Sequence, residues 1–386
     1  MNIGIIGVGR LGLCYALVLE QQGFNVVASS YKQDYIDQLK LKQSNSVEPG
    51  VADLVARTNI EFTVDNHHVI ASCDLLYVMV ATPSNERGDY DITAVEQVVN
   101  NFLTYSGSVA NKILVIGSTV NPGDCERLQK QLNHLGVNIV YSPTFAAQGT
   151  VLRDITNPNN LLLGTENTQV AEQCRQVFVK VVGESTPVFC VHSTTAEILK
   201  LAGNCRATMV ISYFNMMGEI LINSGMAKDL DAAATFLNSV KAANKWSPGY
   251  GYGGPCYPRD NRAFVHYAQT IGTDYPLGKV IDEFNQGHVD FLFKYFVQDN
   301  AENLPYYFEY LSYKQGVNIF EESQQLQVCQ MLLDAGYTVY VEPSVYLLPK
   351  IREDLVRDYN TVNFETLAEL AERGQQVYNA NNLIKK

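Results

Sequence analysis

The first half of the chain alternates short apolar runs with longer segments in which apolar residues recur at helical spacing. Runs that are apolar at nearly every position are typical of strands buried on both faces of a parallel sheet. The predicted strands are residues 2–6, 24–28, 74–80, 112–117, 138–141, 161–164 and 186–190. Helices are predicted between them over residues 92–103 and 124–135. This order predicts an α/β domain with a doubly wound sheet.

The pattern changes at residue 194. Apolar residues recur at helical spacing from Thr195 to about Ser224, which predicts one long helix, and a second helix is predicted over 229–240. A polar stretch at 298–303 predicts a linker. The elements predicted after it are a strand at 306–311, a helix at 323–335 and a strand at 337–341. This strand–helix–strand order predicts a second, smaller α/β domain.

Length and charge argue against several classes of partner. The chain of 386 residues is long enough for two or three domains, and its net charge is −12 with no long basic run. Nucleic-acid binders carry a concentrated positive face, so we expect no nucleic-acid partner. No apolar run approaches about 20 residues, so no membrane span is expected. The first residues lack the basic leader of a signal peptide, so none is expected.

Eight cysteines are scattered along the chain without a Cys-x-x-Cys pair. This pattern is typical of reduced thiols and predicts a cytoplasmic protein. Because Cys14, Cys73 and Cys190 lie in apolar surroundings, we expect them in the core.

A glycine-rich loop follows the first predicted strand. The segment Gly7-Val8-Gly9-Arg10-Leu11-Gly12 has the pattern G-x-G-x-x-G and opens a helix that is predicted to end at Gly23. In such loops the first glycine permits a tight turn, the second lets a pyrophosphate approach, and the third lets helix pack on strand. The residues predicted to bind a dinucleotide here are Gly7, Gly9, Arg10, Leu11 and Gly12.

The second predicted strand ends without the acidic residue that usually binds the ribose 2′-hydroxyl of NAD. Its tip is Ser29-Ser30-Tyr31-Lys32, and the Ser30 hydroxyl with the Lys32 ammonium would suit a 2′-phosphate. NADP therefore stays open beside NAD, and so does a plain loop with no influence on cofactor choice.

Polar and proline residues follow several predicted strands. They include Thr82 and Pro83, then Ser118 and Thr119, and then the segment 142–145. Open α/β sheets bind ligands outside the carboxyl ends of their strands. We therefore place Thr82, Pro83 and Thr119 beside the cofactor.

Four glycines within residues 249–254 come just before Cys256, which stands between Pro255 and Pro258. Glycine lets a backbone bend tightly and approach a ligand closely. A helix could open at Asn261, and a thiol just before a helix start lies where backbone amides favour its nucleophilic thiolate form. The stretch fits a catalytic cysteine beside a polar substrate, and equally a surface turn with a small buried cysteine.

Two polar residues of the long helix share one face. Lys200 and Asn204 are four residues apart, which places them on successive turns. Without further context they are either a functional pair or two solvated side chains.

With these segments in hand, the chain resembles the UDP-glucose/GDP-mannose dehydrogenase family nearly end to end, most closely its UDP-glucose 6-dehydrogenase type. The most specific match is Gly251–Asp260, which is similar to the family's GFGG-C-PKD signature. The other matching segments are the amino-terminal glycine loop, Val47–Gly50, Ala81–Pro83 with Gly88 and Asp91, Gly117–Gly123 and Thr195–Asn204.

The resemblance implies a four-electron oxidation of a nucleotide sugar's C6 alcohol to a carboxylate through a cysteine thiohemiacetal and thioester, with UDP-glucose as the default substrate. Carried over by position, Cys256 would be the nucleophile, Lys200 would stabilise the oxyanion and Asn204 would hold the C6 oxygen. Asp260 would orient or activate water, and Thr119 would hold a water or the nicotinamide side. The substrate-binding residues implied are Phe145, Lys200, Asn204, Tyr250, Tyr252, Gly253 and Arg259.

The chain departs from the family at several of these positions. Thr144 and Gln148 stand where the family has glutamates, and the first of those is a proposed general base. Arg259 replaces a lysine, which keeps the charge but not the geometry. The segment 314–323 lacks an aspartate pair and an arginine of the family's run, and Lys241 is the nearest match to an arginine that the family lends across its dimer.

We therefore predict two Rossmann-like doubly wound domains joined by a long central helix. Residues 1–190 would bind NAD(P), residues 191–290 would form a helical dimerisation region with the cysteine loop, and residues 291–386 would bind the nucleotide sugar. The predicted protein is a cytoplasmic homodimer that uses NAD or NADP and no metal.

Two other functions stay open. The lost glutamates would also fit a catalytically weakened regulatory protein that binds nucleotide sugars. A 3-hydroxyacid dehydrogenase would share the layout and use a lysine–asparagine pair, but it would need no cysteine.

Overall fold

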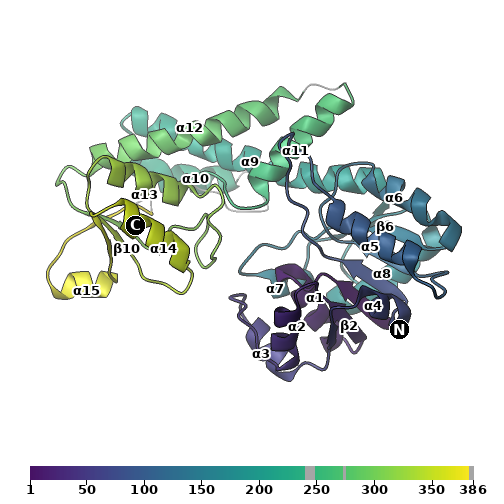
Figure 1. Cartoon of the computed structure of the whole chain (residues 1–386). Coiled ribbons are helices and arrows are strands. Elements are labelled where there is room, and N and C mark those ends of the chain that lie inside the picture. The colour runs from purple at the N-terminus through teal and green to yellow at the C-terminus, as the bar shows by residue number, and fades with distance from the viewer. Residues whose placement is uncertain (240–247, 273–274, 382–386) are drawn as a thin grey trace. The chain divides into compact units, whose positions relative to one another are not determined.

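The computed structural model describes residues 1–239, 248–272 and 275–381 (Figure 1). The chain falls into two compact units, Met1–Leu201 and Ala202–Lys386. Lys241 lies outside the described residues. The division at residues 190 and 290 stays a prediction, and residue 290 itself lies within one continuous helix.

The first unit is built on a sheet with the strand order β3-β2-β1-β4-β5-β6-β7-β8 within the described residues. The strands are β1 Asn2–Ile6, β2 Asn25–Ser29, β3 Glu61–Thr63, β4 Leu75–Val78, β5 Ile113–Ile116, β6 Asn138–Tyr141, β7 Leu161–Gly164 and β8 Val188–Val191. Neighbouring strands run parallel except β6 and β7, which are antiparallel. The predicted doubly wound α/β fold is confirmed, and β3 is a strand that the apolar pattern missed.

Helices alternate with these strands. They are α1 Arg10–Gln21, α2 Gln33–Lys40, α3 Val51–Arg57, α4 Asn66–Ser72, α5 Thr93–Thr104, α6 Asp124–Leu132, α7 Val151–Thr156 and α8 Thr168–Val182. The predictions at 92–103 and 124–135 correspond to α5 and to α6 with the short 3-10 turn Asn133–Leu135.

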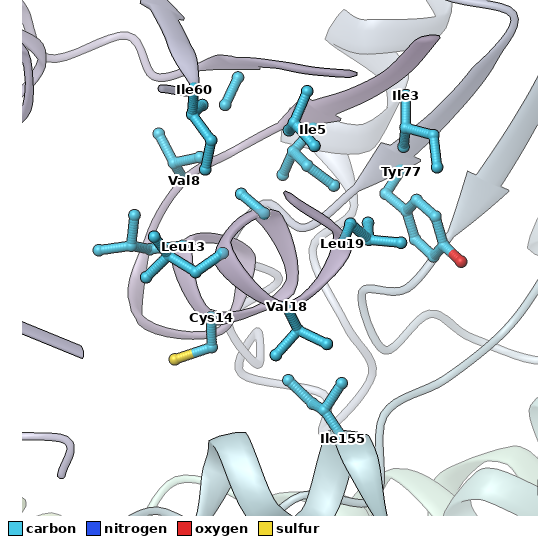
Figure 2. Close-up of a cluster of buried hydrophobic side chains, with 14 of the residues drawn as sticks. Ile3, Ile5, Val8, Leu13, Cys14, Val18, Leu19, Ile60, Tyr77 and Ile155 are labelled. Atoms are coloured by element: carbon cyan, nitrogen blue, oxygen red, sulfur yellow. The ribbon is translucent and has the colours of Figure 1, made fainter. Parts of the chain in front are cut away.

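The core of the first unit forms where β1 meets α1. Ile3 and Ile5 of β1 are fully buried, as are the neighbouring positions of β4, because helices cover both faces of the sheet. Figure 2 shows Val18 of α1 facing Ile155 of α7, with Leu13 and Cys14 on the same helix. This packing fixes the start of α1, and with it the glycine loop that precedes α1.

The second unit contains helices and a small parallel sheet with the strand order β11-β10-β9-β12 within the described residues. The strands are β9 Tyr306–Phe308, β10 Val339–Val341, β11 Val362–Phe364 and β12 Tyr378–Asn379. The helices from α9 onward are α9 Ser193–Asn223, α10 Leu230–Ser239, α11 Tyr257–Thr270, α12 Pro276–Asp299, α13 Gln324–Asp334, α14 Pro349–Asp358 and α15 Leu367–Glu372. The order of strands is that of half a Rossmann sheet, which confirms the smaller α/β domain.

The long helix predicted over 195–224 is α9, and the boundary between the two units falls within it. Helix α12 continues to Asp299, so the predicted linker at 298–303 begins in its last residues. In the described residues no helix is both long and apolar enough to cross a lipid bilayer. The eight cysteines, all of them described, form no disulfide.

One prediction about the cysteines is wrong. Cys14 and Cys73 are buried as expected, and burial raises the pKa of each thiol to about 12. Cys190 is exposed, because β8 is an edge strand of the sheet and its neighbour Phe189 is exposed as well. An apolar run on an edge strand is covered on fewer sides than one in the middle of a sheet.

Candidate active site

The glycine loop has the geometry of a dinucleotide site. Gly7 has a φ of +101°, and a Cβ at this position would lie 2.6 Å from the carbonyl oxygen of Met79. A Cβ at Gly12 would lie 2.1 Å from the carbonyl oxygen of Gly7, whereas a Cβ at Gly9 would meet nothing within 4 Å. Gly7 and Gly12 are therefore required by the fold itself, while Gly9 leaves space at the start of α1. Backbone amides at such a helix start bind phosphate.

Gly12→Ala is expected to lower the free energy of unfolding by about 1–3 kcal/mol, because the added methyl group overlaps backbone that cannot move aside. Gly9→Ala should leave this free energy near the wild-type value and instead weaken dinucleotide binding, since it fills the space that the pyrophosphate needs. Denaturant unfolding and fluorescence titration with NAD measure the two effects. Equal stabilities of the two variants would contradict this division of roles.

The tip of β2 holds the residues that bear on cofactor choice. The hydroxyl of Ser29 is buried and donates to Oδ1 of Asn66 at 2.7 Å, so it faces the interior. Ser30 is half-buried, Tyr31 is exposed, and Nζ of Lys32 lies 5.5 Å from the centre of the Tyr31 ring. Of the two serines at this tip, Ser30 is the more accessible to solvent.

The loop between β5 and α6 is fixed by a buried carboxylate. Thr119 is half-buried in this loop, and Ser118 donates its hydroxyl to the carbonyl oxygen of Val80 at 2.7 Å. Glu197 of α9 accepts from the amides of Gly123 and Cys125 at 2.6 and 2.8 Å. Burial raises the pKa of Glu197. The two strand ends, after β4 and β5, are thereby held together at the carboxyl edge of the sheet.

Thr82 and Pro83 follow β4 at the same edge. Thr82 is buried and Pro83 is exposed, and the carbonyl oxygen of Pro83 accepts from the amide of Asp91 at 2.8 Å. The predicted cofactor residues of this edge therefore differ in accessibility, and Pro83 is the more open of the two.

Lys200 is held at the carboxyl end of β6. Its side chain is nearly buried, and Nζ donates to the carbonyl oxygen of Thr144 at 2.9 Å. The same ammonium lies 4.8 Å from the centre of the Phe145 ring, which is half exposed. The Thr144 hydroxyl donates to the Tyr15 hydroxyl of α1 at 2.9 Å. The structure thus brings the predicted residues Lys200 and Phe145 together.

Gln148, the second position that departs from the family, lies in the turn before α7. Sequence reasoning missed a carboxylate that binds this turn. Glu48 accepts from the amides of Gly149 and Val151 at 2.8 and 2.6 Å, which caps α7. The signal in the sequence is the glutamate of the segment Val47–Gly50.

In the second unit, Cys256 is the residue immediately before α11, which begins at Tyr257 and not at Asn261 as expected. The helix starts earlier because Pro258 falls in its first turn, where a missing N–H costs no hydrogen bond. The thiol is exposed at this N-terminus. Cys256 thus lies just before a helix start, and an activated thiolate at this position stays a prediction.

Asp260 lies one turn into α11 and its side chain is buried. Oδ2 of Asp260 accepts from Nδ2 of Asn204 at 2.5 Å, and Nε of Arg259 lies 3.6 Å from Oδ1. The thiol of Cys205 lies 3.7 Å from the carbonyl oxygen of Asp260. Three of the predicted residues, Asn204, Arg259 and Asp260, are thus in contact.

The glycine stretch before Cys256 is held by buried side chains that the sequence did not single out. Asn285 binds both the amide and the carbonyl of Tyr252, each at 2.9 Å. Gln324 accepts from the amide of Gly251 at 2.6 Å, and a Cβ at Gly251 would lie 2.1 Å from Oδ1 of Asn285. The amide of Gly254 donates to the carbonyl oxygen of Glu321 at 2.8 Å. The backbone of this loop is therefore fixed before any ligand binds.

Two predicted substrate residues of the stretch point their side chains inward. Tyr252 is almost fully buried, and burial raises the pKa of its hydroxyl. The Tyr250 hydroxyl donates to the carbonyl oxygen of Ala380 at 2.6 Å. A contact of either residue with a substrate would have to come from its backbone, as it would at Gly253.

A small cavity, about large enough for a single water molecule, lies at the carboxyl ends of β9 and β10. Its lining includes the polar residues Tyr310, Ser312, Glu342, Ser344 and Tyr346. Open α/β sheets bind ligands at this edge. In the described residues no cluster of histidine, cysteine or carboxylate side chains suited to a metal ion is found.

Several proteins of known family are similar to this chain. The chain is 24% identical over 359 residues to a UDP-glucose 6-dehydrogenase of Pseudomonas aeruginosa, covering 88% of this chain and 78% of that protein. It is 28% identical over 287 residues to a UDP-glucose 6-dehydrogenase of Rhizobium meliloti, covering 71% of this chain and 64% of that protein.

A UDP-glucose dehydrogenase structure from Pyrobaculum islandicum has the same fold. It aligns with a TM-score of 0.82 at 21% identity, over 98% of this chain and 89% of that one. The model of the UDP-glucose/GDP-mannose dehydrogenase family's NAD binding domain matches residues 1–182, and the model of its central domain matches residues 194–287. The chain therefore belongs to the UDP-glucose/GDP-mannose dehydrogenase family, whose members are NAD-dependent oxidoreductases of nucleotide sugars.

Proposed function

We propose that the protein oxidises the C6 alcohol of a nucleotide sugar to the carboxylate, with UDP-glucose as the first candidate and Cys256 as the nucleophile. The observation that carries this proposal is the exposed Cys256 thiol at the N-terminus of α11, directly after a loop whose backbone is already fixed. The oxidation removes four electrons. Relatives that are named UDP-glucose 6-dehydrogenases support the choice of sugar.

The glycine loop fits a nicotinamide dinucleotide. A side chain at Gly7 or Gly12 would fill the turn, and the amides at the start of α1 suit a pyrophosphate. Gly7, Gly9, Arg10, Leu11 and Gly12 would hold the dinucleotide, with Thr82, Pro83 and Thr119 at the neighbouring strand ends. When bound, the cofactor accepts hydride, and two such transfers account for the four electrons. NAD is our first choice, and Ser30 with Lys32 keeps NADP open.

The covalent steps belong to Cys256. After the alcohol has been oxidised to the aldehyde, the thiolate adds to the carbonyl carbon and a thiohemiacetal forms. Once this carbon has lost its hydride, the product is a thioester, and water breaks the carbon–sulfur bond to give the carboxylate and the free thiol. A thiolate is needed because a thioester is activated toward water, whereas a serine ester is less so.

The remaining roles follow from the contacts. The Lys200 ammonium would stabilise the oxyanion that forms when the thiolate adds or water attacks. Asn204 would bind the C6 oxygen, and Asp260 would orient the water, since these two side chains already touch. Thr144 offers a hydroxyl in place of a carboxylate and that hydroxyl is bound to Tyr15, so Asp260 is the acidic group that we assign to the hydrolysis. The roles of Phe145, Gly253 and Arg259 in sugar binding stay predictions.

The test is the amount of cofactor reduced for each sugar consumed, measured with UDP-glucose and separately with NAD and NADP. Two cofactors for each sugar would support the four-electron reaction and identify the cofactor. One cofactor for each sugar would leave the covalent steps without support. The homodimer and the cytoplasmic location also stay predictions.

If UDP-glucose is inert, a panel of other nucleotide sugars follows. Binding of a nucleotide sugar by calorimetry without any reduction would favour the regulatory function, to which the substitutions at Thr144 and Gln148 also point. Reduction with a 3-hydroxyacid instead would overturn the proposal.

A further inference from the structure

A buried histidine of α12 contacts the start of the glycine stretch that precedes Cys256. His288 is 1% exposed, and its Nε2 lies 2.8 Å from the carbonyl oxygen of Gly249. Its Nδ1 lies 2.6 Å from Oε1 of Glu219, on α9. The ring is stacked between Phe284 and Phe291, with ring centres 5.7 Å away on either side. Both ring nitrogens therefore make polar contacts, and both faces of the ring lie against apolar rings.

The two partners determine where the hydrogens lie. A carbonyl oxygen can only accept, so Nε2 must carry a hydrogen to bind Gly249. A carboxylate oxygen faces Nδ1, so this contact also needs a proton between its two atoms. The other contacts of the ring are the Gly249 carbonyl and the two phenyl rings. Glu219 therefore fixes the orientation of the imidazole, and Nε2 is directed at the loop.

We propose that His288 is a positioning residue for the loop that carries Cys256, and that Glu219 holds the imidazole in the orientation that binds this loop. The proposal rests on the proposed role of Cys256. Asn285, Gln324 and the Glu321 carbonyl hold the middle and the end of this loop, and His288 holds its first carbonyl.

Position, and not stability, is what such a pair contributes. Removing two charges from water costs about as much as their attraction returns, so buried ion pairs add little to folding stability. A phenylalanine at position 288 could still stack on Phe284 and Phe291, but it could not bind the Gly249 carbonyl. The specific gain from histidine at this place is the hydrogen bond to the loop.

The two contacts of the ring depend on each other. Glu219 holds Nδ1 at 2.6 Å, and this orientation directs Nε2 at the Gly249 carbonyl. Glu219→Gln should keep this orientation, because its amide can donate to Nδ1 while Nε2 keeps its hydrogen.

The experiment measures the alkylation of Cys256 by iodoacetamide with peptide mass spectrometry, beside kcat and KM, at one fixed pH. Cys190 is exposed in the other unit and serves as an internal control in each sample. The variants are His288→Leu, the milder His288→Gln and Glu219→Gln, with Glu283→Gln as the matched control on the exposed side of α12. Thermal melting shows that each variant is folded.

We expect His288→Leu to lower kcat by roughly 10- to 100-fold, the cost of a misplaced catalytic group. Cys256 alkylation should slow by about two- to fivefold as the thiol shifts from the amides of α11, while Cys190 is unchanged. Glu219→Gln should keep both kcat and Cys256 alkylation within about twofold of the wild type, because its amide can still bind Nδ1.

A folded His288→Leu or His288→Gln variant with wild-type kcat and wild-type Cys256 alkylation would overturn the proposal. So would a Glu219→Gln variant that slows kcat and Cys256 alkylation as much as His288→Leu does. The two proposals can fail separately. If the wild type oxidises no nucleotide sugar, but the His288 variants still slow Cys256 alkylation as expected, the proposed function is refuted and this inference stands.

Discussion

Cys256→Ser is expected to reduce the rate of carboxylate formation by at least about 10³-fold, because it removes the nucleophile on which the second oxidation depends. A serine hydroxyl is not ionised near neutral pH, so the amides at the start of α11 have no anion to stabilise. The fold should survive the change, since serine is a favoured residue at a helix N-cap, the position that Cys256 occupies. The readout is the number of cofactors reduced for each sugar consumed, with chromatography of the sugar products.

Cys190→Ser is the matched control for this variant. It removes the other exposed thiol, on the edge strand β8, and should leave the stoichiometry at two cofactors for each sugar. If Cys256→Ser also reduced two cofactors for each sugar at the wild-type rate, a thioester route would be ruled out.

Lys200→Met is expected to lower kcat by about 10²- to 10³-fold, the usual cost of removing one group that stabilises an oxyanion. Methionine keeps most of the apolar stem of the side chain and lacks the charge. The ammonium is already held in place by the Thr144 carbonyl and the Phe145 ring. Little conformational entropy would therefore be lost when it binds the oxyanion. Steady-state kinetics with saturating sugar give kcat, and melting checks the fold.

A lysine in a similar contact provides the control. Nζ of Lys180, on α8, lies 5.1 Å from the centre of the Phe24 ring, and Lys180→Met should leave kcat unchanged. A kcat for Lys200→Met within twofold of the wild type would show that the charge of Lys200 takes no part in the chemistry.

The sequence contained most of the first sheet and the glycine loop, because a strand buried on both faces must be apolar at nearly every position. β1, β4, β5 and β6 stand out for this reason. Gly7 and Gly12 were found because backbone at those places excludes a side chain, which is a local requirement. Features that depend on neighbours in sequence were therefore accessible.

Features that depend on residues distant in the sequence could not be predicted. Asn285, His288 and Gln324 are polar residues on helices, and a polar residue in a helix is usually solvated, so nothing local shows that these are buried against the glycine stretch. The strand β12 has only two residues, and β11 carries an asparagine at its centre and is only half-buried, so neither forms an apolar run. The exposure of Cys190 follows from the edge position of its strand, which only the sheet order reveals.

Because most of the cysteines are buried, a thiol reagent can be used to count the exposed thiols of the native protein. Six of the eight, all within the described part of the chain, are buried, and Cys190 and Cys256 are the two that are exposed. In a Cys190→Ser background, a chromogenic disulfide reagent added to native protein should release one equivalent of dye per chain in its fast phase. The amplitude of that phase would give the concentration of intact Cys256 in any preparation, so that turnover numbers could be stated per reactive thiol.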